Sequence, residues 1–164
     1  MQNLFSDLEG LRIAVEIEVR GREFYRQAAE QAAKDEHREL FQWLADEECT
    51  HEAKFAGILS QISACKEAHS DEYLFDADTS RYLTVIADHH VFPKAADAKA
   101  AIAELKTVGA ILRTALQAEK DSVLFYDELA RNAKFDAAKE VFALLKAEEQ
   151  AHVVKIRQML DIWA

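Results

Sequence analysis

An internal repeat constrains this chain more than any other feature. When the 164-residue sequence is shifted by 101 positions, residues 4–63 align with residues 105–164 without a gap. Such self-similarity indicates two copies of one supersecondary unit that bury their hydrophobic faces against each other. The aligned pairs include Leu11 and Leu112, Glu18 and Glu119, Phe41 and Phe142, Leu44 and Leu145, and His51 and His152.

Composition favours helices for the repeated unit. The chain has one Pro and four Gly, while half of its residues are hydrophobic and 30% are charged. This scarcity of turn signals indicates an all-α domain with a hydrophobic core. The four long helices are predicted at about Asn3–Ala33, Asp35–Ala64, Asp97–Asn132, and from Asp136 almost to the C-terminus.

Polar residues mark the predicted helix starts. Ser6 and Glu9 have the spacing of a capping box, which predicts the ordered start of the first helix. Asp35, Asp97 and Asp136 are candidate N-caps of the other three.

A connection of about 30 residues, 66–96, joins the two hairpins. Within it, the stretch DTSRYLTVIADHHVFP predicts a short helix closed by Pro93. Because a 20-residue helix spans about 30 Å, this connection is long enough to cross a helical bundle from end to end. The sequence therefore predicts one domain over residues 1–164, a four-helix bundle of two helical hairpins joined by one long crossover.

Each repeat carries one Glu-x-x-His motif. The segments EECTH and EEQAH contain Glu48 with His51 and Glu149 with His152, and the chain has no other match to the motif. Residues at positions i and i+3 share one helix face. Leu44 lies on the same stripe as the first motif, so this face is predicted to be buried.

A third carboxylate accompanies each motif. Glu18 and the middle of Glu48–His51 are equally far from the first predicted hairpin turn, at residues 33–34. Glu119 stands in the same relation to the second motif about the turn at residues 134–135. Residues equidistant from the turn of an antiparallel hairpin lie at one level. We therefore expect four carboxylates and two imidazoles to converge in the bundle.

Four buried carboxylates cannot all remain ionised without compensating charge. Two divalent cations would supply it, and neutral imidazoles would complete the coordination. Oxygen and nitrogen ligands without thiolates suit iron or manganese, and zinc can substitute. A Glu from each of two helices and a Glu-x-x-His from each of the other two is the di-iron carboxylate arrangement. The predicted metal ligands are Glu18, Glu48, His51, Glu119, Glu149 and His152.

Four more side chains are candidates for roles beside the ligands. Glu47 and Glu148 fit either acceptors for the outer N–H of a ligand histidine or ordinary surface acids. Tyr25 and Tyr126 lie two turns beyond the third carboxylates, on the same face. They fit either core packing or a hydrogen bond or electron relay beside the metals.

The cysteines and the remaining histidines carry weaker signals. Cys49 and Cys65 form no disulfide framework or thiolate metal site, and both are expected to be packing residues. The other histidines, His37, His69, His89 and His90, have no partner pattern, although His89-His90 could bind metal adventitiously.

Four segments resemble the rubrerythrin branch of the ferritin-like superfamily: EVRGREFY, FQWLADEECTH, QAEKDSVLFY and FALLKAEEQAH. The crossover segment YLTVIADHHVFP is also similar to that branch, so the resemblance covers nearly the whole chain and implies a ferritin-like bundle. It further implies that Glu48 and Glu149 bridge two metals, that Glu18 and Glu119 are terminal ligands, and that His51 and His152 cap one metal each.

The chain departs from that branch in two ways. Rubrerythrin proper carries a C-terminal rubredoxin with four cysteines, which this chain lacks. Rubrerythrin also has a further Glu one turn after the terminal ligand of the third helix, where this chain has Ser122. The resulting symmetric ligand set is similar to that of ferritins and simpler erythrins.

The charge and the chain ends limit location and partners. A net charge of −10 argues against nucleic-acid binding and against docking on anionic membranes. The N-terminus lacks a signal-peptide pattern, and no apolar run approaches the roughly 20 residues needed to span a bilayer. We expect a cytoplasmic protein.

Three functions are compatible with these residues. The first is an oxidoreductase that reduces peroxide or O₂ at two iron ions, with electrons from a separate rubredoxin-like donor. The second is a ferritin-type iron-handling protein or ferroxidase, although no fifth helix for cage assembly follows the fourth, and a homodimer is expected. The third is a helical module with a structural metal, which the buried charge disfavours because an apolar core would be less costly.

Overall fold

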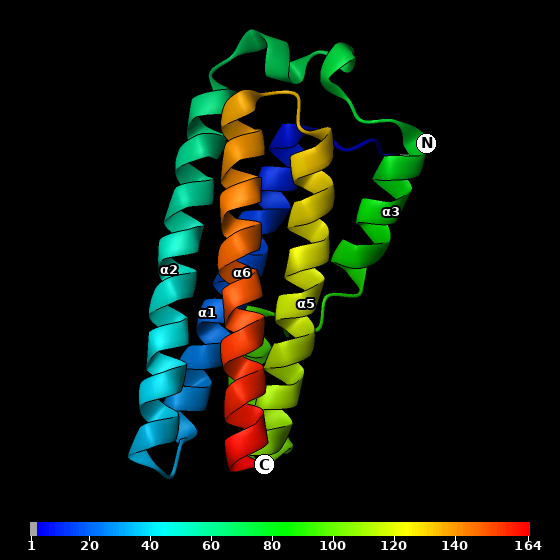
Figure 1. Cartoon of the computed structure of the whole chain (residues 1–164). Coiled ribbons are helices and arrows are strands. Elements are labelled where there is room, and N and C mark those ends of the chain that lie inside the picture. Colours follow the sequence, from blue (N-terminus) through cyan, green and yellow to red (C-terminus); the bar gives the residue numbers. More distant parts are fainter. Residues whose placement is uncertain (1–2) are drawn as a thin grey trace.

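The computed structural model describes residues 3–164, which contain six α-helices (Figure 1). The four long helices are α1 (Asp7–Gln31), α2 (Asp35–Ser63), α5 (Val108–Asn132) and α6 (Asp136–Trp163). In the bundle, α1 pairs with α2 and α5 pairs with α6, as two antiparallel hairpins. The all-α bundle of two hairpins with one long crossover, predicted from the sequence, is confirmed.

The crossover runs along the outside of the bundle (Figure 1). Two 3₁₀ turns, Lys66–His69 and Asp71–Tyr73, lead from α2 into α3 (Ala77–Asp88), which lies beside α5. A third 3₁₀ turn, Ala95–Asp97, leads into α4 (Ala98–Leu105), which contacts α1. The short helix predicted in the crossover is therefore present, and it ends before the proline that was expected to close it.

Capping chemistry explains the start of α1 but not of every helix. The Ser6 hydroxyl accepts a hydrogen bond from the backbone N–H of Glu9 at 3.3 Å, as the capping-box spacing predicted. The prediction that Asp35 and Asp136 are N-caps is wrong, because each is the first helical residue and follows a cap without a side-chain hydrogen bond. An acid in the first turn still interacts favourably with the helix dipole.

The single helix predicted over Asp97–Asn132 is also wrong, because the structure breaks it into α4 and α5. Lys106 at the break has φ of 60°, a left-handed conformation that ends a helix of L-residues. Thr107 then starts α5, since its hydroxyl accepts from the backbone N–H of Ala110 at 3.1 Å. Thr107 is the repeat equivalent of Ser6, so the repeat itself contained the signal for this second start.

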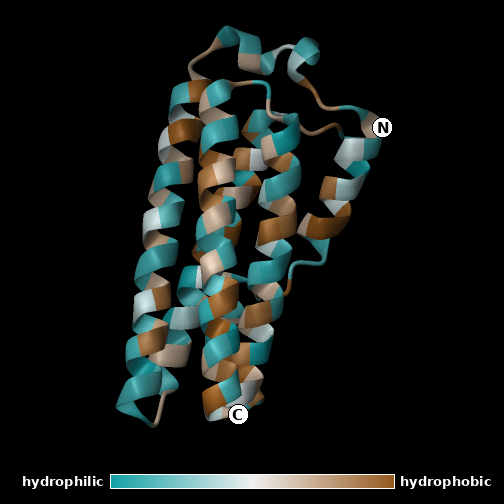
Figure 2. Ribbon diagram, in the orientation of Figure 1, coloured by the Kyte–Doolittle hydropathy of each residue, from teal (hydrophilic) through white to brown (hydrophobic). Residues whose placement is uncertain are grey.

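The long helices are amphipathic, and hydrophobic and hydrophilic residues alternate along them (Figure 2). Their buried apolar side chains form two clusters. One contains Leu11, Phe55 and Phe125, and the other contains Phe24 and Leu44. On each long helix, the predicted ligand positions fall between the residues of these two clusters. Apolar layers therefore separate the charged level of the bundle from both of its ends.

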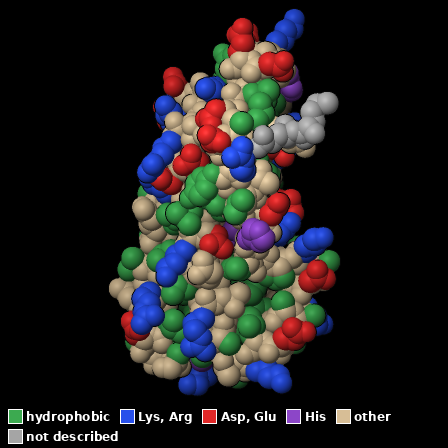
Figure 3. Space-filling view, turned by 90° about the vertical axis from the view of Figure 1, so that its right-hand side faces the viewer, with side chains coloured by type: hydrophobic (Ala, Val, Ile, Leu, Met, Phe, Trp, Pro, Cys, Tyr) green, Lys and Arg blue, Asp and Glu red, His purple; other side chains and the backbone are tan. Residues whose placement is uncertain are grey.

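The outer surface is mixed in character. Acidic and basic side chains both occur on the face shown in Figure 3, with hydrophobic side chains gathered near its middle. No helix within residues 3–164 is long and apolar enough to cross a membrane. Cys49, expected to pack, is exposed on α2, whereas Cys65 packs partly buried against the core.

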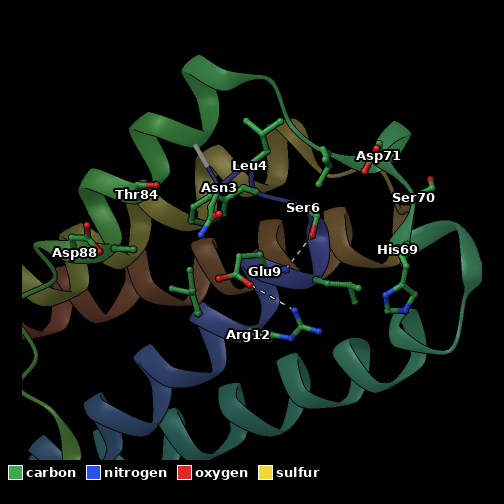
Figure 4. A pocket seen from close by; sticks show the side chains of 16 residues that line it. Asn3, Leu4, Ser6, Glu9, Arg12, His69, Ser70, Asp71, Thr84 and Asp88 are labelled. Carbon is green, nitrogen blue, oxygen red and sulfur yellow. Dashed lines mark hydrogen bonds and ion pairs between the residues drawn. The ribbon is translucent and has the colours of Figure 1, made fainter. Parts of the chain in front are cut away.

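A surface pocket of about 710 Å³ lies between the N-terminal segment, the first two 3₁₀ turns and α3 (Figure 4). Its lining includes Glu9 and Arg12, which form an ion pair, and His69. None of the predicted metal ligands lines this pocket.

Candidate metal centre

The structure brings all six predicted ligands together at one level of the bundle. Each side chain is at most 2% exposed. They form two overlapping sets, and within each set one oxygen or nitrogen atom per residue lies within 4.8 Å of the others. Glu48 and Glu149 belong to both sets. The first set adds Glu18 and His51, and the second adds Glu119 and His152.

The Nδ1 atoms of the two histidines face the carboxylates. His51 Nδ1 lies 2.9 Å from Glu149 Oε1 and 3.4 Å from Glu18 Oε2. His152 Nδ1 lies 2.9 Å from the other oxygen of Glu149. The two imidazole rings stack, with centroids 5.3 Å apart and planes inclined by 17°. Glu149 therefore presents one oxygen to each imidazole, as a carboxylate shared by two metal positions would.

The outer nitrogens of the histidines face carboxylates from the opposite hairpin. His51 Nε2 lies 2.8 Å from Glu148 Oε2, and Lys54 Nζ lies 3.1 Å from the other oxygen of Glu148. His152 Nε2 lies 3.9 Å from Glu47 Oε2, which is beyond hydrogen-bond range. Glu148 thus lies against the outer nitrogen of His51, whereas Glu47 is not in direct contact with His152.

The two tyrosines connect the hairpins. The Tyr126 hydroxyl donates to Glu18 Oε1, and the Tyr25 hydroxyl donates to Glu119 Oε1. Both tyrosines are fully buried, and Tyr126 also packs against Phe55 at a centroid distance of 5.0 Å. Core packing and hydrogen bonding, the two alternatives that the sequence left open, therefore occur together. Burial raises the pKa of both phenols well above the usual range, so each keeps the proton that it donates.

Burial and mutual repulsion determine the protonation of the cluster. Burial, with repulsion from Glu18, raises the pKa of Glu48 well above its usual range. Burial, with repulsion from Glu119 and then Glu18, raises the pKa of Glu149 to about 8. Burial alone would lower the pKa of each histidine, but the adjacent carboxylates outweigh it and raise the values to about 11 for His51 and about 10 for His152. Near pH 7 the metal-free cluster therefore holds protons that its histidines and carboxylates share.

The donor set fits two divalent cations. The four buried carboxylates carry four negative charges when all are ionised, and two such ions would balance them. Several ligand atoms also lack a hydrogen-bond partner, because the short contacts between histidines and carboxylates do not have hydrogen-bond geometry. Buried polar atoms without partners are uncommon in native proteins. The orphaned atoms are Glu18 Oε2, Glu48 Oε1, both carboxylate oxygens of Glu149, both ring nitrogens of His51 and Nδ1 of His152.

Comparison with known proteins agrees with this geometry. The profile of the Rubrerythrin family matches residues 9–103 and 110–162. The chain belongs to the rubrerythrin family. Its six unmatched residues between these segments include the α4–α5 break. A solved structure of a hypothetical protein from Pyrococcus furiosus is similar at 26% sequence identity and a TM-score of 0.67, and the match covers 97% of this chain and 90% of that chain. No curated protein matches significantly.

In this rubrerythrin-family chain, the crossover closes the site on the side of α1 and α5. Gly21 and Ser122 are repeat equivalents, one turn beyond the third carboxylates. A Cβ atom on Gly21 would lie 2.9 Å from Phe92 Cε2 and 3.3 Å from Glu48 Cδ. Ser122 Oγ lies 3.1 Å from His90 Nε2. The buried side chains of Phe92 and His90 therefore cover these two positions.

The sequence did not predict that His90 and Phe92 lie at the site. His90 Nδ1 accepts from the backbone N–H of Phe92 at 3.3 Å, so Nε2 carries the proton and donates to Ser122 Oγ. Ser122 in turn donates to the carbonyl of Ala118. Burial lowers the pKa of His90, which keeps the ring neutral. Adventitious metal binding by His89-His90 does not fit this arrangement, because both nitrogens of His90 are hydrogen-bonded.

Gly21→Ala is expected to lower both stability and metal affinity. The added methyl group would push against Phe92 and Glu48, and overpacking of this kind costs about 1–3 kcal/mol. Gly57→Ala is the matched control, because nothing lies within 4 Å of its Cβ position on α2. The control should be stabilised by about 0.5–1 kcal/mol. Thermal melting and metal titration of both variants test this prediction, and equal behaviour would contradict it.

Tyr126→Phe is expected to weaken metal binding without unfolding the bundle. The change removes a hydrogen bond to Glu18, and such outer partners alter metal affinity by roughly 10–100-fold. We expect metal affinity to fall by about tenfold, the lower end of that range. Anaerobic titration of ferrous iron into metal-free protein measures it. Tyr82→Phe, at an exposed position on α3, is the control. Unchanged affinity in Tyr126→Phe would mean that Glu18 is held in place without the phenol.

Proposed function

We propose that the chain is a di-iron oxidoreductase that reduces peroxide or O₂. The observation that carries the proposal is the pair of overlapping ligand sets that share Glu48 and Glu149. Oxygen and nitrogen donors without thiolates suit iron, with manganese or zinc as substitutes. Membership of the rubrerythrin family supports a metal at this site.

Two ferrous ions, when bound, would supply the electrons that reduce the oxidant. The protein would supply the ligands, their orientation and a site that excludes water. The six ligands hold the ions, and the phenols of Tyr25 and Tyr126 orient the terminal carboxylates from across the bundle. The two apolar clusters above and below the charged level exclude water, which strengthens every electrostatic interaction within the site.

Ferritin-type iron oxidation is the second candidate. It is favoured by the symmetry of the ligand set and by Ser122, which is hydrogen-bonded to His90 where rubrerythrin proper has a further carboxylate. In that case O₂ rather than peroxide would be the preferred oxidant, and the oxidised iron would leave the site or be stored instead of being re-reduced.

Rapid mixing of the di-ferrous protein with peroxide tests the first candidate. One fast oxidation that then stops is expected, because reduction of one peroxide to two waters consumes two electrons and two protons. Reduced rubredoxin with its reductase should restore cycling, since each pair of electrons returns the site to its starting state. Preference for O₂ without re-reduction would favour the second candidate. Continuous release of O₂ from peroxide alone would indicate a catalase-type reaction, with manganese as the expected metal.

A further inference from the structure

The two ligand histidines have different surroundings, although the repeat makes them equivalent. The outer side of His51 faces Glu148 at 2.8 Å. The outer side of His152 has no carboxylate in hydrogen-bond range, since Glu47 is 3.9 Å away. Instead, the Trp43 ring and the imidazole of His152 pack in a T-shaped arrangement, with centroids 5.5 Å apart and planes inclined by 76°.

Trp43 connects this ligand with the surface. The indole packs against His152, yet 42% of the residue is exposed. It lines a surface groove of about 570 Å³ together with Leu40, Met159 and Trp163. Its repeat equivalent is Leu144, an aliphatic residue that is 50% exposed. The repeat thus offers an aromatic route from the surface to His152 that its other half replaces with leucine.

We propose that Trp43 is the residue through which electrons reach the site, passing from a small one-electron carrier protein through the indole to the imidazole of His152. This inference rests on the proposed oxidoreductase function. Electron tunnelling weakens steeply with distance, and Trp43 is a partly exposed side chain whose ring packs against His152. Two transfers, each from one carrier protein that leaves oxidised, return two ferric ions to the ferrous state. The indole makes and breaks no bond and returns unchanged.

Trp43→Leu tests the route, because it gives the first repeat the residue found in the second. Re-reduction of the oxidised protein by reduced rubredoxin should slow several-fold, while oxidation of the di-ferrous form by peroxide and the iron content stay unchanged. Trp163→Phe is the matched control, since Trp163 lines the same groove but packs on His37 at 4.4 Å rather than on a ligand. Its re-reduction should match that of the unaltered protein. Trp43→Phe retains an aromatic ring at this position, so it distinguishes the loss of the indole from a folding defect in the leucine variant.

Fluorescence gives a second readout that needs no turnover. The chain has two tryptophans, so Trp163→Phe leaves Trp43 as the only emitter. Cobalt(II) added to this metal-free variant should quench its emission strongly, whereas the Trp163 emission of Trp43→Phe should change little. Equal re-reduction rates in the unaltered protein and Trp43→Leu would overturn the proposed electron route but not the proposed function. Trp43 emission that does not change when cobalt is added would do the same. Absence of any redox cycling in the unaltered protein would overturn both proposals.

Discussion

Glu48→Gln is expected to abolish metal binding at both positions, whereas Glu18→Gln should leave one position occupied. Glu48 belongs to both ligand sets, and Glu18 belongs to one. A neutral amide cannot balance the charge of two cations. The loss for Glu48→Gln should therefore exceed the roughly 10–100-fold that changes around metal ligands produce. Anaerobic calorimetric titration with ferrous iron would give two equivalents for the unaltered protein, none for Glu48→Gln and one for Glu18→Gln.

Glu39→Gln provides the control for this comparison, because it removes an exposed acid from the same helix as Glu48. It should bind metal as the unaltered protein does. Comparable losses in Glu48→Gln and Glu18→Gln would contradict the assignment of Glu48 as the shared ligand. Saturation of the unaltered protein at one equivalent would contradict the symmetric site itself.

Metal should raise the melting temperature by more than about 10 °C at pH 8. A ligand that binds only the folded state contributes about 4 kcal/mol per site at a free concentration about 1,000 times its Kd. In a chain of this size, each kcal/mol corresponds to about 2–4 °C. The gain arises because the metal-free cluster buries four carboxylates, and two cations remove the need for the protons that offset their charge.

The same gain should shrink as the pH falls. Glu149 has a pKa of about 8 in the folded protein against 4.5 without the fold, so the stability that its proton contributes is lost as the pH rises between these values. The pKa values of His51 and His152, raised from 6.5 to about 11 and about 10, extend this loss to higher pH. Metal needs the deprotonated forms, so its affinity changes in the opposite direction.

Melting curves at pH 6 and pH 8, with ferrous iron and with a chelator, measure both effects. The metal-free protein should be less stable at pH 8 than at pH 6, and the stabilisation by metal should be larger at pH 8. A melting temperature that does not respond to metal would mean that the carboxylates do not act as one site.

The sequence predicted the cluster of six candidate ligands because their positions follow from helical periodicity and hairpin geometry. The Glu-x-x-His motifs share a helix face, and equal distance from a hairpin turn places Glu18 and Glu119 at their level. The residues of the crossover obey no such rule. His90 and Phe92 lie at the site because the crossover passes α1 and α5 there. Neither helical periodicity nor the repeat predicts the course of the crossover.

Two further features were not predicted from the sequence, because they depend on the conformation of one backbone residue and on the direction of one side chain. Nothing in the residue type of Lys106 indicates a left-handed conformation, so the break before α5 could be found only by aligning Thr107 with Ser6. The contact of Trp43 with His152 depends on the rotamer of one exposed side chain. The hairpin motifs contained Trp43, but its spacing from His51 does not indicate a contact with the histidine of the other hairpin.

The sharing of Glu48 and Glu149 has a consequence for how the protein comes apart. Each ligand set takes three residues from one hairpin and one from the other. Most helix–helix contacts, by contrast, lie within the hairpins α1–α2 and α5–α6. Such hairpins behave as separate cooperative units in local unfolding. Bound metal would link these two units, so that the hairpins separate only after a metal–carboxylate bond breaks. The lifetime of the folded state would then depend on the rate of metal release.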